Sequence, residues 1–158
     1  MLYFAYGSNM DPHQMRRRCP SSRFVTIARL ADHRLAFTRR SPRRRCGVAG
    51  VVADDGAEVW GVVYHLRKTR DIQRLDAAEG YRPHAARGNR YTRDTRLVDA
   101  EGNESRPMAA EIYLAAPTRF VLPPSLTYVA HMLRGARHWG LPHDYVNQLN
   151  HIPTTGRL

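Results

Sequence analysis

The chain has 158 residues, of which 42% are hydrophobic and 25% are charged, and its formal net charge is +11. This length and composition are typical of one globular domain that buries a core without disulfides or a metal. No apolar run approaches the ~18 residues that a membrane-spanning helix needs, which argues against a membrane protein.

The first residues predict a strand rather than a targeting signal. Residues 1–5 are apolar from the start and the chain turns polar at Tyr6, whereas a signal peptide needs a charged leader and then an apolar core. We therefore expect no signal peptide, no membrane contact and a cytoplasmic location. In that compartment Cys19 and Cys46 should be free thiols, and neither belongs to a C-x-x-C metal pair.

The positive charge comes almost entirely from arginine, because Lys68 is the only lysine. The arginines cluster at 16–18 and 39–45. Such clusters neutralise the phosphates of a nucleic acid, or they cover a compact fold and attract anionic metabolites. Neither cluster contains an aromatic residue that would stack on bases. The sequence therefore favours the second explanation, and nucleic acid is an unfavoured partner.

The first third of the chain predicts one helix among short strands. A strand covers residues 1–6. Asp11-Pro12 is an N-cap followed by proline at the first helical position, which predicts a helix over 12–18. Two short strands follow at 24–30 and 33–38. The arginine- and proline-rich segment 39–45 is expected to be a loop.

The next segment has the pattern of a hairpin. Residues 47–53 are rich in valine and predict a strand. Asp54-Asp55-Gly56 is a strong hairpin-turn signal. Residues 58–64 then form the returning strand, and their nearly continuous apolar character predicts burial on both faces.

The middle of the chain predicts a helix followed by a hairpin. Thr69 is a suitable N-cap for a helix over 70–79, which Gly80 ends. Residues 82–90 form a loop. Strands are expected at 91–98 and 108–114, with a turn at 101–103 between them.

The last third predicts two helices. The first covers 125–138, with an apolar stripe at helical spacing, and Gly140 and Pro142 end it. The second covers 143–150. We expect a single domain over 1–150 and a loose C-terminal tail over 151–158. About seven strands with separate helices indicate an α+β fold with a mostly antiparallel sheet. Such a sheet can close into a barrel.

Glu79 is the candidate acid–base residue. In a helix over 70–79 it lies on the same face as Ile72 and Leu75, so it should point inward. Burial and the negative end of the helix dipole both disfavour its anion and raise its pKa, which suits a general acid and base near neutral pH. The alternative is a surface acid or an ion pair with Arg82 or Arg90. Asp76 is a possible second carboxylate, for which a structural role is expected.

The turn after the first strand is the candidate ligand site. Gly7 allows a sharp bend that leaves successive N–H groups accessible, and such groups bind carboxylates or oxyanions. Ser8 and Asn9 add side-chain donors. Ser8 is no nucleophile candidate, because it does not lie in a G-x-S-x-G elbow. The alternative is an ordinary strand-to-helix turn.

Taken together, these segments resemble the γ-glutamylcyclotransferase family. The resemblance runs in order through about 150 residues. Asn9 favours the γ-glutamylcyclotransferase and AIG2-like branches, since the glutathione-degrading branch typically has leucine there. The matching segments are Tyr6-Gly7-Ser8-Asn9, residues 58–64, residues 75–81, Gly88-Asn89-Arg90-Tyr91, residues 123–128 and Gly140-Leu141-Pro142.

The resemblance implies a small β-barrel with flanking helices and a specific reaction. The α-amine of a γ-glutamyl substrate attacks its own γ-carbonyl, which forms 5-oxoproline and expels an amine. Glu79 is implied as the proton carrier, with no metal and no cofactor. The substrate-binding residues implied are Tyr6, Gly7, Ser8, Asn9, Tyr91 and Tyr128.

Several points stay open at this stage. A non-catalytic module that binds γ-glutamyl ligands and a basic nucleic-acid-binding protein are the alternative functions. Tyr128 has a core aromatic as its alternative role. The protein is expected to be a monomer or a homodimer. The arginine-rich segment 39–45 is not part of the family pattern. If it borders the pocket, it would select a substrate with an acidic leaving group, or a polyanion.

Overall fold

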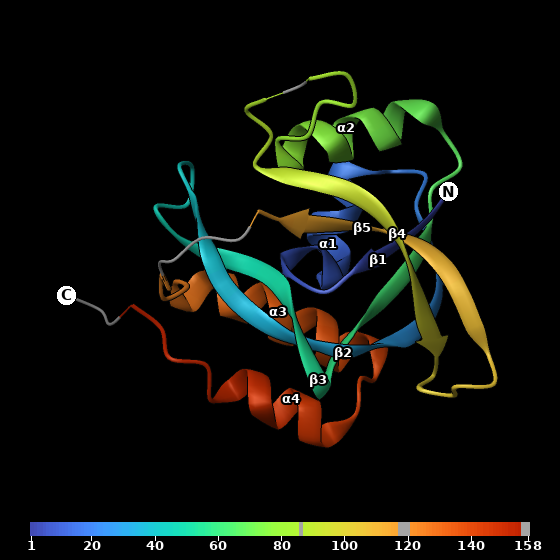
Figure 1. The fold of residues 1–158 in the computed structure, drawn as a ribbon, viewed down its shortest axis with the longest axis vertical. Coiled ribbons are helices and arrows are strands. Elements are labelled where there is room, and N and C mark those ends of the chain that lie inside the picture. Colours follow the sequence, from blue (N-terminus) through green and yellow to red (C-terminus); the bar gives the residue numbers. More distant parts are fainter. Residues whose placement is uncertain (86, 117–120, 156–158) are drawn as a thin grey trace.

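A closed five-stranded barrel forms the centre of the molecule in a computed structural model that describes residues 1–85, 87–116 and 121–155 (Figure 1). The strands are arranged in the order β1-β3-β2-β4-β5. Neighbours pair in antiparallel fashion, except that β1 and β5 are parallel. The predicted α+β barrel is therefore confirmed. The strands are β1 (Leu2–Ala5), β2 (Arg23–Ser41), β3 (Cys46–His65), β4 (Tyr91–Ala100) and β5 (Pro107–Ala115).

The helices lie around this barrel, with α2 on one side and α3 and α4 on the opposite side (Figure 1). Each predicted helix is confirmed. The helical elements are η1 (Ser8–Met10), α1 (Pro12–Arg18), α2 (Thr69–Glu79), α3 (Leu126–Trp139) and α4 (His143–Asn150).

Most helix ends have the capping groups that the sequence predicted. The Asp11 carboxylate accepts from the N–H of His13 at 2.9 Å and caps α1. Gly80 and Gly140 adopt the left-handed conformation and end α2 and α3. At the start of α2 the prediction was wrong by one residue, because Lys68 is the N-cap and makes no side-chain capping bond.

The predicted hairpin at 54–56 is wrong. Strand β3 runs through it and pairs with β2 on both sides, so that Ala31 lies opposite Glu58 and His33 opposite Ala53. Residues 54–57 therefore bulge opposite Asp32. Gly56 stabilises this bulge. It has a φ of 79°, and its N–H donates to Asp32 Oδ1 at 2.9 Å. Four predicted strands thus become two, and seven become five.

The segment 39–45 is only partly a loop. Strand β2 continues to Ser41, and residues 42–45 make the turn into β3. The Arg45 N–H donates to the Ser41 carbonyl at 2.7 Å and closes this turn. Arg39 and Arg40 consequently sit on an ordered strand, where backbone pairing with β3 fixes their positions.

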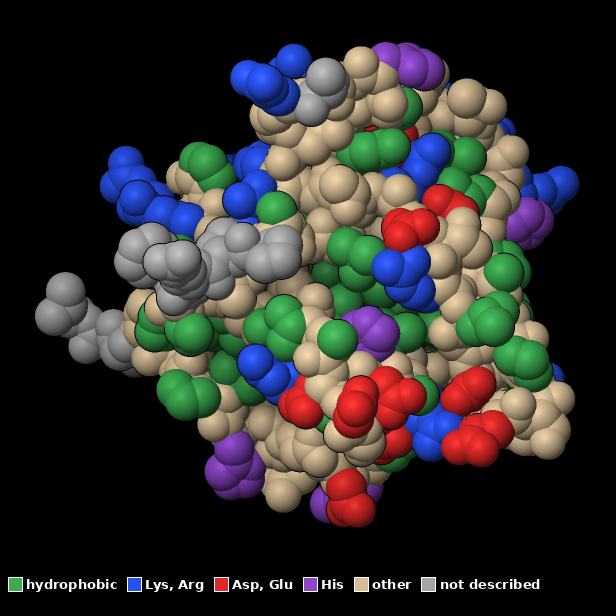
Figure 2. All heavy atoms as spheres, in the orientation of Figure 1, with side chains coloured by type: hydrophobic (Ala, Val, Ile, Leu, Met, Phe, Trp, Pro, Cys, Tyr) green, Lys and Arg blue, Asp and Glu red, His purple; other side chains and the backbone are tan. Residues whose placement is uncertain are grey.

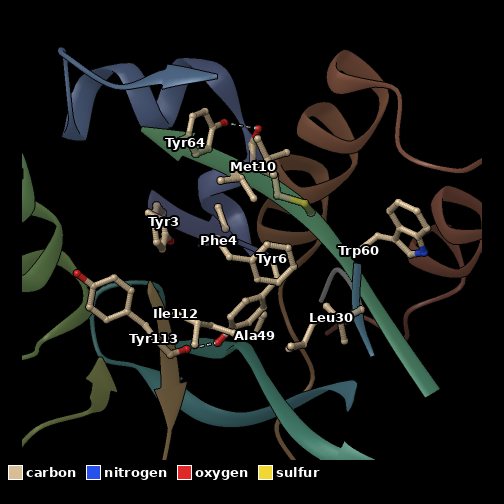
Figure 3. Packing of buried hydrophobic residues seen from close by; sticks show 14 of the residues in the cluster. Tyr3, Phe4, Tyr6, Met10, Leu30, Ala49, Trp60, Tyr64, Ile112 and Tyr113 are labelled. Carbon is tan, nitrogen blue, oxygen red and sulfur yellow. Dashed lines mark hydrogen bonds between the residues drawn. The ribbon is translucent and has the colours of Figure 1, made fainter. Parts of the chain in front are cut away.

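Aromatic side chains fill the barrel and join it to the first turn (Figure 3). The rings of Tyr3 and Tyr113 meet edge to face with centroids 5.7 Å apart. The Tyr6 hydroxyl donates to the Tyr113 carbonyl at 2.5 Å, and the Tyr64 hydroxyl donates to the Met10 carbonyl at 3.2 Å. Because buried hydroxyls need partners, these bonds hold β1 and η1 against the barrel wall.

Both cysteines, Cys19 and Cys46, are buried free thiols, as predicted. None of the helices in the described part of the chain combines the length and apolar character that a bilayer crossing requires. Of the predicted tail, residues 156–158 lie outside the described residues. Thr155 is held by a bond from its N–H to the Pro124 carbonyl at 2.9 Å.

Candidate functional site

A cavity of about 80 Å³ lies where the turn after β1 meets the end of α2, the start of β4 and the β2–β3 hairpin. One buried water needs about 10–15 Å³, so this space suits a small polar ligand rather than a macromolecular segment. Every site residue that the sequence predicted lines this one cavity: Tyr6, Gly7, Ser8, Asn9, Glu79, Tyr91 and Tyr128.

Glu79 is the only carboxylate that lines the cavity among the described residues. It is the last residue of α2, and its side chain is 18% exposed. Leu75 on the same face is fully buried, which confirms the predicted inward orientation of this helix face. Glu79 Oε1 accepts from Asn9 Nδ2 at 3.0 Å and lies 3.6 Å from Arg18 Nη1. Its ion-pair partner is therefore Arg18.

Burial raises the pKa of the Glu79 carboxyl above its usual value. The positive charge of Arg18, the hydrogen bond from Asn9, and the more distant charges of Arg90 and Arg44 lower the pKa and offset part of this effect. Burial is the larger influence. The direction of the shift agrees with the sequence prediction and brings the group toward the range in which a carboxyl both accepts and donates a proton.

Asn9 holds the Glu79 carboxylate in place. Its Nδ2 donates to Glu79 Oε1 and to the Tyr3 hydroxyl, both at 3.0 Å. Its Oδ1 accepts from Arg18 Nη1 at 2.7 Å and from Gln14 Nε2 at 3.0 Å. Four bonds fix the amide, so its donor side can only face Glu79.

Sequence reasoning missed Tyr3, Gln14 and Arg18 as parts of this network. A signal was present for two of them. Gln14 and Arg18 are four residues apart in the predicted helix 12–18, which puts them on one face. Because that helix begins soon after Asn9, the face that carries Gln14 and Arg18 can lie against the Asn9 side chain. The Gln14 Nε2 also donates to Ser8 Oγ at 2.8 Å, so α1 fastens the whole turn.

Tyr128 and Tyr91 hold the opposite wall of the cavity through Ala49. The Ala49 N–H donates to the Tyr128 hydroxyl at 3.0 Å, and the Tyr91 hydroxyl donates to the Ala49 carbonyl at 2.8 Å. A Cβ on Gly7 would lie 2.8 Å from the Tyr128 hydroxyl oxygen, so only glycine lets that hydroxyl come so near. Tyr6 is only 6% exposed and forms part of the cavity wall.

The second carboxylate on α2 has its own partners. Asp76 accepts two bonds from Arg93 Nη1 at 2.9 Å and one from the Tyr113 hydroxyl at 2.5 Å. It does not line the cavity. These contacts tie α2 to β4 and β5, in agreement with the structural role expected for Asp76.

Arginines dominate the rest of the cavity lining, and three of them come from the β2–β3 hairpin: Arg39, Arg40 and Arg44. Figure 2 shows Lys and Arg side chains projecting at the upper left, where the hairpin tip lies in Figure 1, whereas acidic side chains gather in the lower part of that face. Within residues 1–85, 87–116 and 121–155, no group of three or more His, Cys, Asp or Glu side chains is arranged to hold a metal.

Comparisons with known proteins agree with this geometry. The family model described as γ-glutamyl cyclotransferase, AIG2-like, matches residues 3–130. The γ-glutamylcyclotransferase of Mus musculus is 34% identical over 155 residues, which cover 96% of this chain and 78% of its own. The Homo sapiens γ-glutamylcyclotransferase is 33% identical over the same shares. A solved γ-glutamyl cyclotransferase structure has a TM-score of 0.88 and 31% identity, covering 99% of this chain and 90% of its own. The chain therefore belongs to the γ-glutamyl cyclotransferase, AIG2-like family.

Proposed function

We propose that this protein is a γ-glutamylcyclotransferase, which converts a γ-glutamyl amide into 5-oxoproline and releases an amine or amino acid. The observation that carries the proposal is the setting of Glu79. It is a sheltered carboxyl with a raised pKa, fixed by Asn9 in a small polar cavity. Relatives that carry this name at 33–34% identity support the same activity.

The reaction needs positioning and proton transfer. The substrate's α-nitrogen attacks its γ-carbonyl carbon, so that the ring C–N bond forms and the bond to the leaving nitrogen breaks. Glu79 takes the proton from the α-ammonium group and returns it to the leaving nitrogen, and no net redox change occurs. Because the attack is intramolecular, a pocket that holds the bent conformer supplies much of the acceleration.

The other cavity residues have supporting roles in this proposal. The backbone N–H groups of Gly7, Ser8 and Asn9 bind the glutamyl carboxylate or the developing oxyanion. Tyr128 offers its hydroxyl to the substrate. Burial raises the pKa of Tyr128, partly offset by bonds from the N–H groups of Ala49 and Ser8, so it acts as a neutral hydroxyl. Tyr6 and Tyr91 line the pocket.

Replacement of the proton carrier tests the proposal. We expect Glu79→Gln to lower the rate of 5-oxoproline formation by roughly 100- to 10,000-fold, the range that general acid–base groups contribute. Glutamine keeps an oxygen that accepts from Asn9, so the thermal unfolding midpoint should not collapse. Glu111→Gln on β5, outside the cavity, is the matched control and should keep full activity. Undiminished turnover by the folded Glu79→Gln variant would remove Glu79 from its role.

The same assay distinguishes the alternative of a non-catalytic module. Wild-type protein is incubated with γ-glutamyl dipeptides and γ-glutamyl amines, and both binding and 5-oxoproline are measured. Calorimetric binding without any product after long incubation would favour the binding module over the enzyme.

A further inference from the structure

The cavity carries far more positive charge than its one carboxylate balances. Five arginines of the described residues line it: Arg18, Arg39, Arg40, Arg44 and Arg90. Only Arg18 lies within 4 Å of Glu79. The other four guanidinium groups form no ion pair with any carboxylate of the described residues, although many surface arginines elsewhere do. Unbalanced charge gathered at one pocket points to an anionic ligand.

Two of these arginines are held beside Glu79 by the protein itself. Arg18 donates to Asn9, and Arg44 Nη2 donates to Gln14 Oε1 at 2.6 Å. The Arg44 guanidinium carbon also lies 5.3 Å from the centre of the Tyr128 ring. These two arginines are therefore part of the cavity wall, and the charges of both act on Glu79.

The remaining three arginines line the same cavity, and Arg39 and Arg90 lie near enough to Tyr91 to influence it electrostatically. Arg39 makes one long bond of 3.4 Å to the Asn89 carbonyl. Arg90 lies across Gly80, where a Cβ would come within 2.2 Å of its Nε. The exposed side chain of Arg40 has no hydrogen-bond or ion-pair partner in the described part of the chain. The three come from β2 and from the segment before β4, and all of them line the cavity.

The chemistry of a γ-glutamyl substrate indicates which arginines of the cavity bind each of its two ends. A γ-glutamyl amide has its α-ammonium and α-carboxylate at the same carbon, so both must lie near Glu79. That end therefore engages the Arg18 side and the turn after β1. The leaving group lies at the other end of the substrate, where a simple amine would give Arg39, Arg40 and Arg90 nothing to bind. Guanidinium groups bind carboxylates in strong, charge-assisted and often bidentate fashion.

We infer that the leaving group is an acidic α-amino acid, whose two carboxylates bind Arg39, Arg40 and Arg90. This inference rests on the proposed function and names its substrate class: γ-glutamyl dipeptides that end in glutamate or aspartate. It also gives a function to the arginine-rich hairpin, which the family pattern leaves unexplained.

A set of matched substrates tests it. We would measure kcat/KM for γ-glutamyl-glutamate, γ-glutamyl-glutamine, γ-glutamyl-alanine and γ-glutamyl-ethylamide. Glutamate and glutamine have nearly the same size, so their ratio isolates the second carboxylate. We expect γ-glutamyl-glutamate to exceed γ-glutamyl-glutamine by at least about tenfold, mainly through a lower KM, and the ethylamide to be the poorest substrate.

Variants then assign the preference to residues. Arg39→Gln and Arg40→Gln should each reduce the glutamate-to-glutamine ratio of kcat/KM. Among the described residues the Arg40 side chain has no hydrogen-bond or ion-pair partner, so Arg40→Gln removes no such contact. Arg45→Gln removes the same charge from the same hairpin but lies outside the cavity lining, and it should keep the wild-type ratio.

The possible failures are distinguishable. If none of the substrates yields 5-oxoproline, the proposed function falls and this inference with it. Equal kcat/KM values for the glutamate and glutamine dipeptides would overturn the inference alone. So would an Arg40→Gln variant that keeps the wild-type ratio, or an Arg45→Gln variant that loses it, because the preference would then come from general charge.

Discussion

Single residues set the pH range in which the pocket can work. The pKa of Glu79 is raised by burial and held down in part by Arg18, whose guanidinium lies 3.6 Å away. As the proposed general base, Glu79 must be ionised in the free enzyme. Activity is therefore lost as the pH falls through its pKa, and this acid limb should lie above the ordinary glutamate value of about 4.3.

Arg18→Gln tests this balance. Loss of the nearby positive charge removes an influence that lowers the pKa of Glu79, so the acid limb of kcat/KM should move to higher pH. Arg16→Gln removes an equal charge from an exposed position of the same helix, and its profile should match the wild type. The profiles are measured from pH 4 to 9 by 5-oxoproline release. An acid limb that stays in place, or moves to lower pH, would contradict the assigned role of Arg18.

A second prediction concerns the near contact between Gly7 and Tyr128. A Cβ at residue 7 would lie 2.8 Å from the Tyr128 hydroxyl oxygen and 3.3 Å from the Ala49 Cβ. In Gly7→Ala the hydroxyl must move away and leave the buried Ala49 N–H without its partner. We expect a loss of about 1–3 kcal/mol in the free energy of unfolding and a large loss of activity.

A double-mutant cycle measures that coupling by denaturant unfolding. Tyr128→Phe should cost stability in the wild type and much less in the Gly7→Ala background, where the bond is already broken. Additive effects of the two substitutions would show that Gly7 and Tyr128 act independently.

The residues of the site were predictable from the sequence to different degrees. Glu79 could be found because helical spacing places it on the face of Leu75, and a local pattern is enough for that. The bond of Asn9 to Glu79 could not be found, because it joins residues 70 positions apart. Such contacts depend on how the barrel and helices pack, and no local spacing encodes them.

Among the elements, the contact of α3 with η1 fixes the position of the turn. A Cβ on Gly135 would lie 2.2–2.5 Å from backbone and side-chain atoms of Met10. Only a glycine lets the two helices come so near. Because Met10 follows Asn9 directly, this contact also sets where the Asn9 amide meets Glu79.

We therefore expect Gly135→Ala to destabilise the protein and to lower kcat. This is opposite to its effect in an exposed helix, where alanine would gain about 1 kcal/mol. Ala130→Gly in the same helix is the control: it should lose about 1 kcal/mol of stability through helix propensity and keep the wild-type kcat. Thermal unfolding and steady-state kinetics would be compared. A more stable and fully active Gly135→Ala variant would show that η1 can move away from the added Cβ without loss of stability or activity.

The longest strands show where local signals mislead. Asp54-Asp55-Gly56 has the composition of a hairpin turn, yet it forms a bulge within β3. The choice between turn and bulge depends on whether β2 continues on the other side, and pairing from Arg23 to Ser41 decides it. Helix ends were predicted more accurately, since Asp11, Gly80 and Gly140 act within a single turn.

At the scale of the whole molecule, the net charge of +11 is distributed in a way that suits a small anion more than a nucleic acid. Binding of single strands combines phosphate contacts with aromatic rings on which bases stack. Phe24, at 42% exposed, is the one aromatic side chain among the exposed large hydrophobics of the described residues. It is already stacked on Trp139 with a centroid distance of 4.2 Å. In the part of the chain that the structure describes, the charge is therefore not accompanied by an exposed aromatic ring that is free to stack on bases.

This distribution predicts weak, salt-sensitive binding of single-stranded DNA. At about 150 mM salt the Kd should lie at roughly 10⁻⁴–10⁻⁶ M, the range of non-specific phosphate contacts. Fluorescence anisotropy with a labelled oligonucleotide measures it across salt concentrations. Arg40→Gln and Arg45→Gln should weaken it equally, since each removes one charge from the same hairpin, whereas only Arg40→Gln changes substrate preference. Nanomolar affinity that persists at high salt would instead make nucleic acid a specific partner and remove the reason for assigning the hairpin arginines to a dicarboxylate.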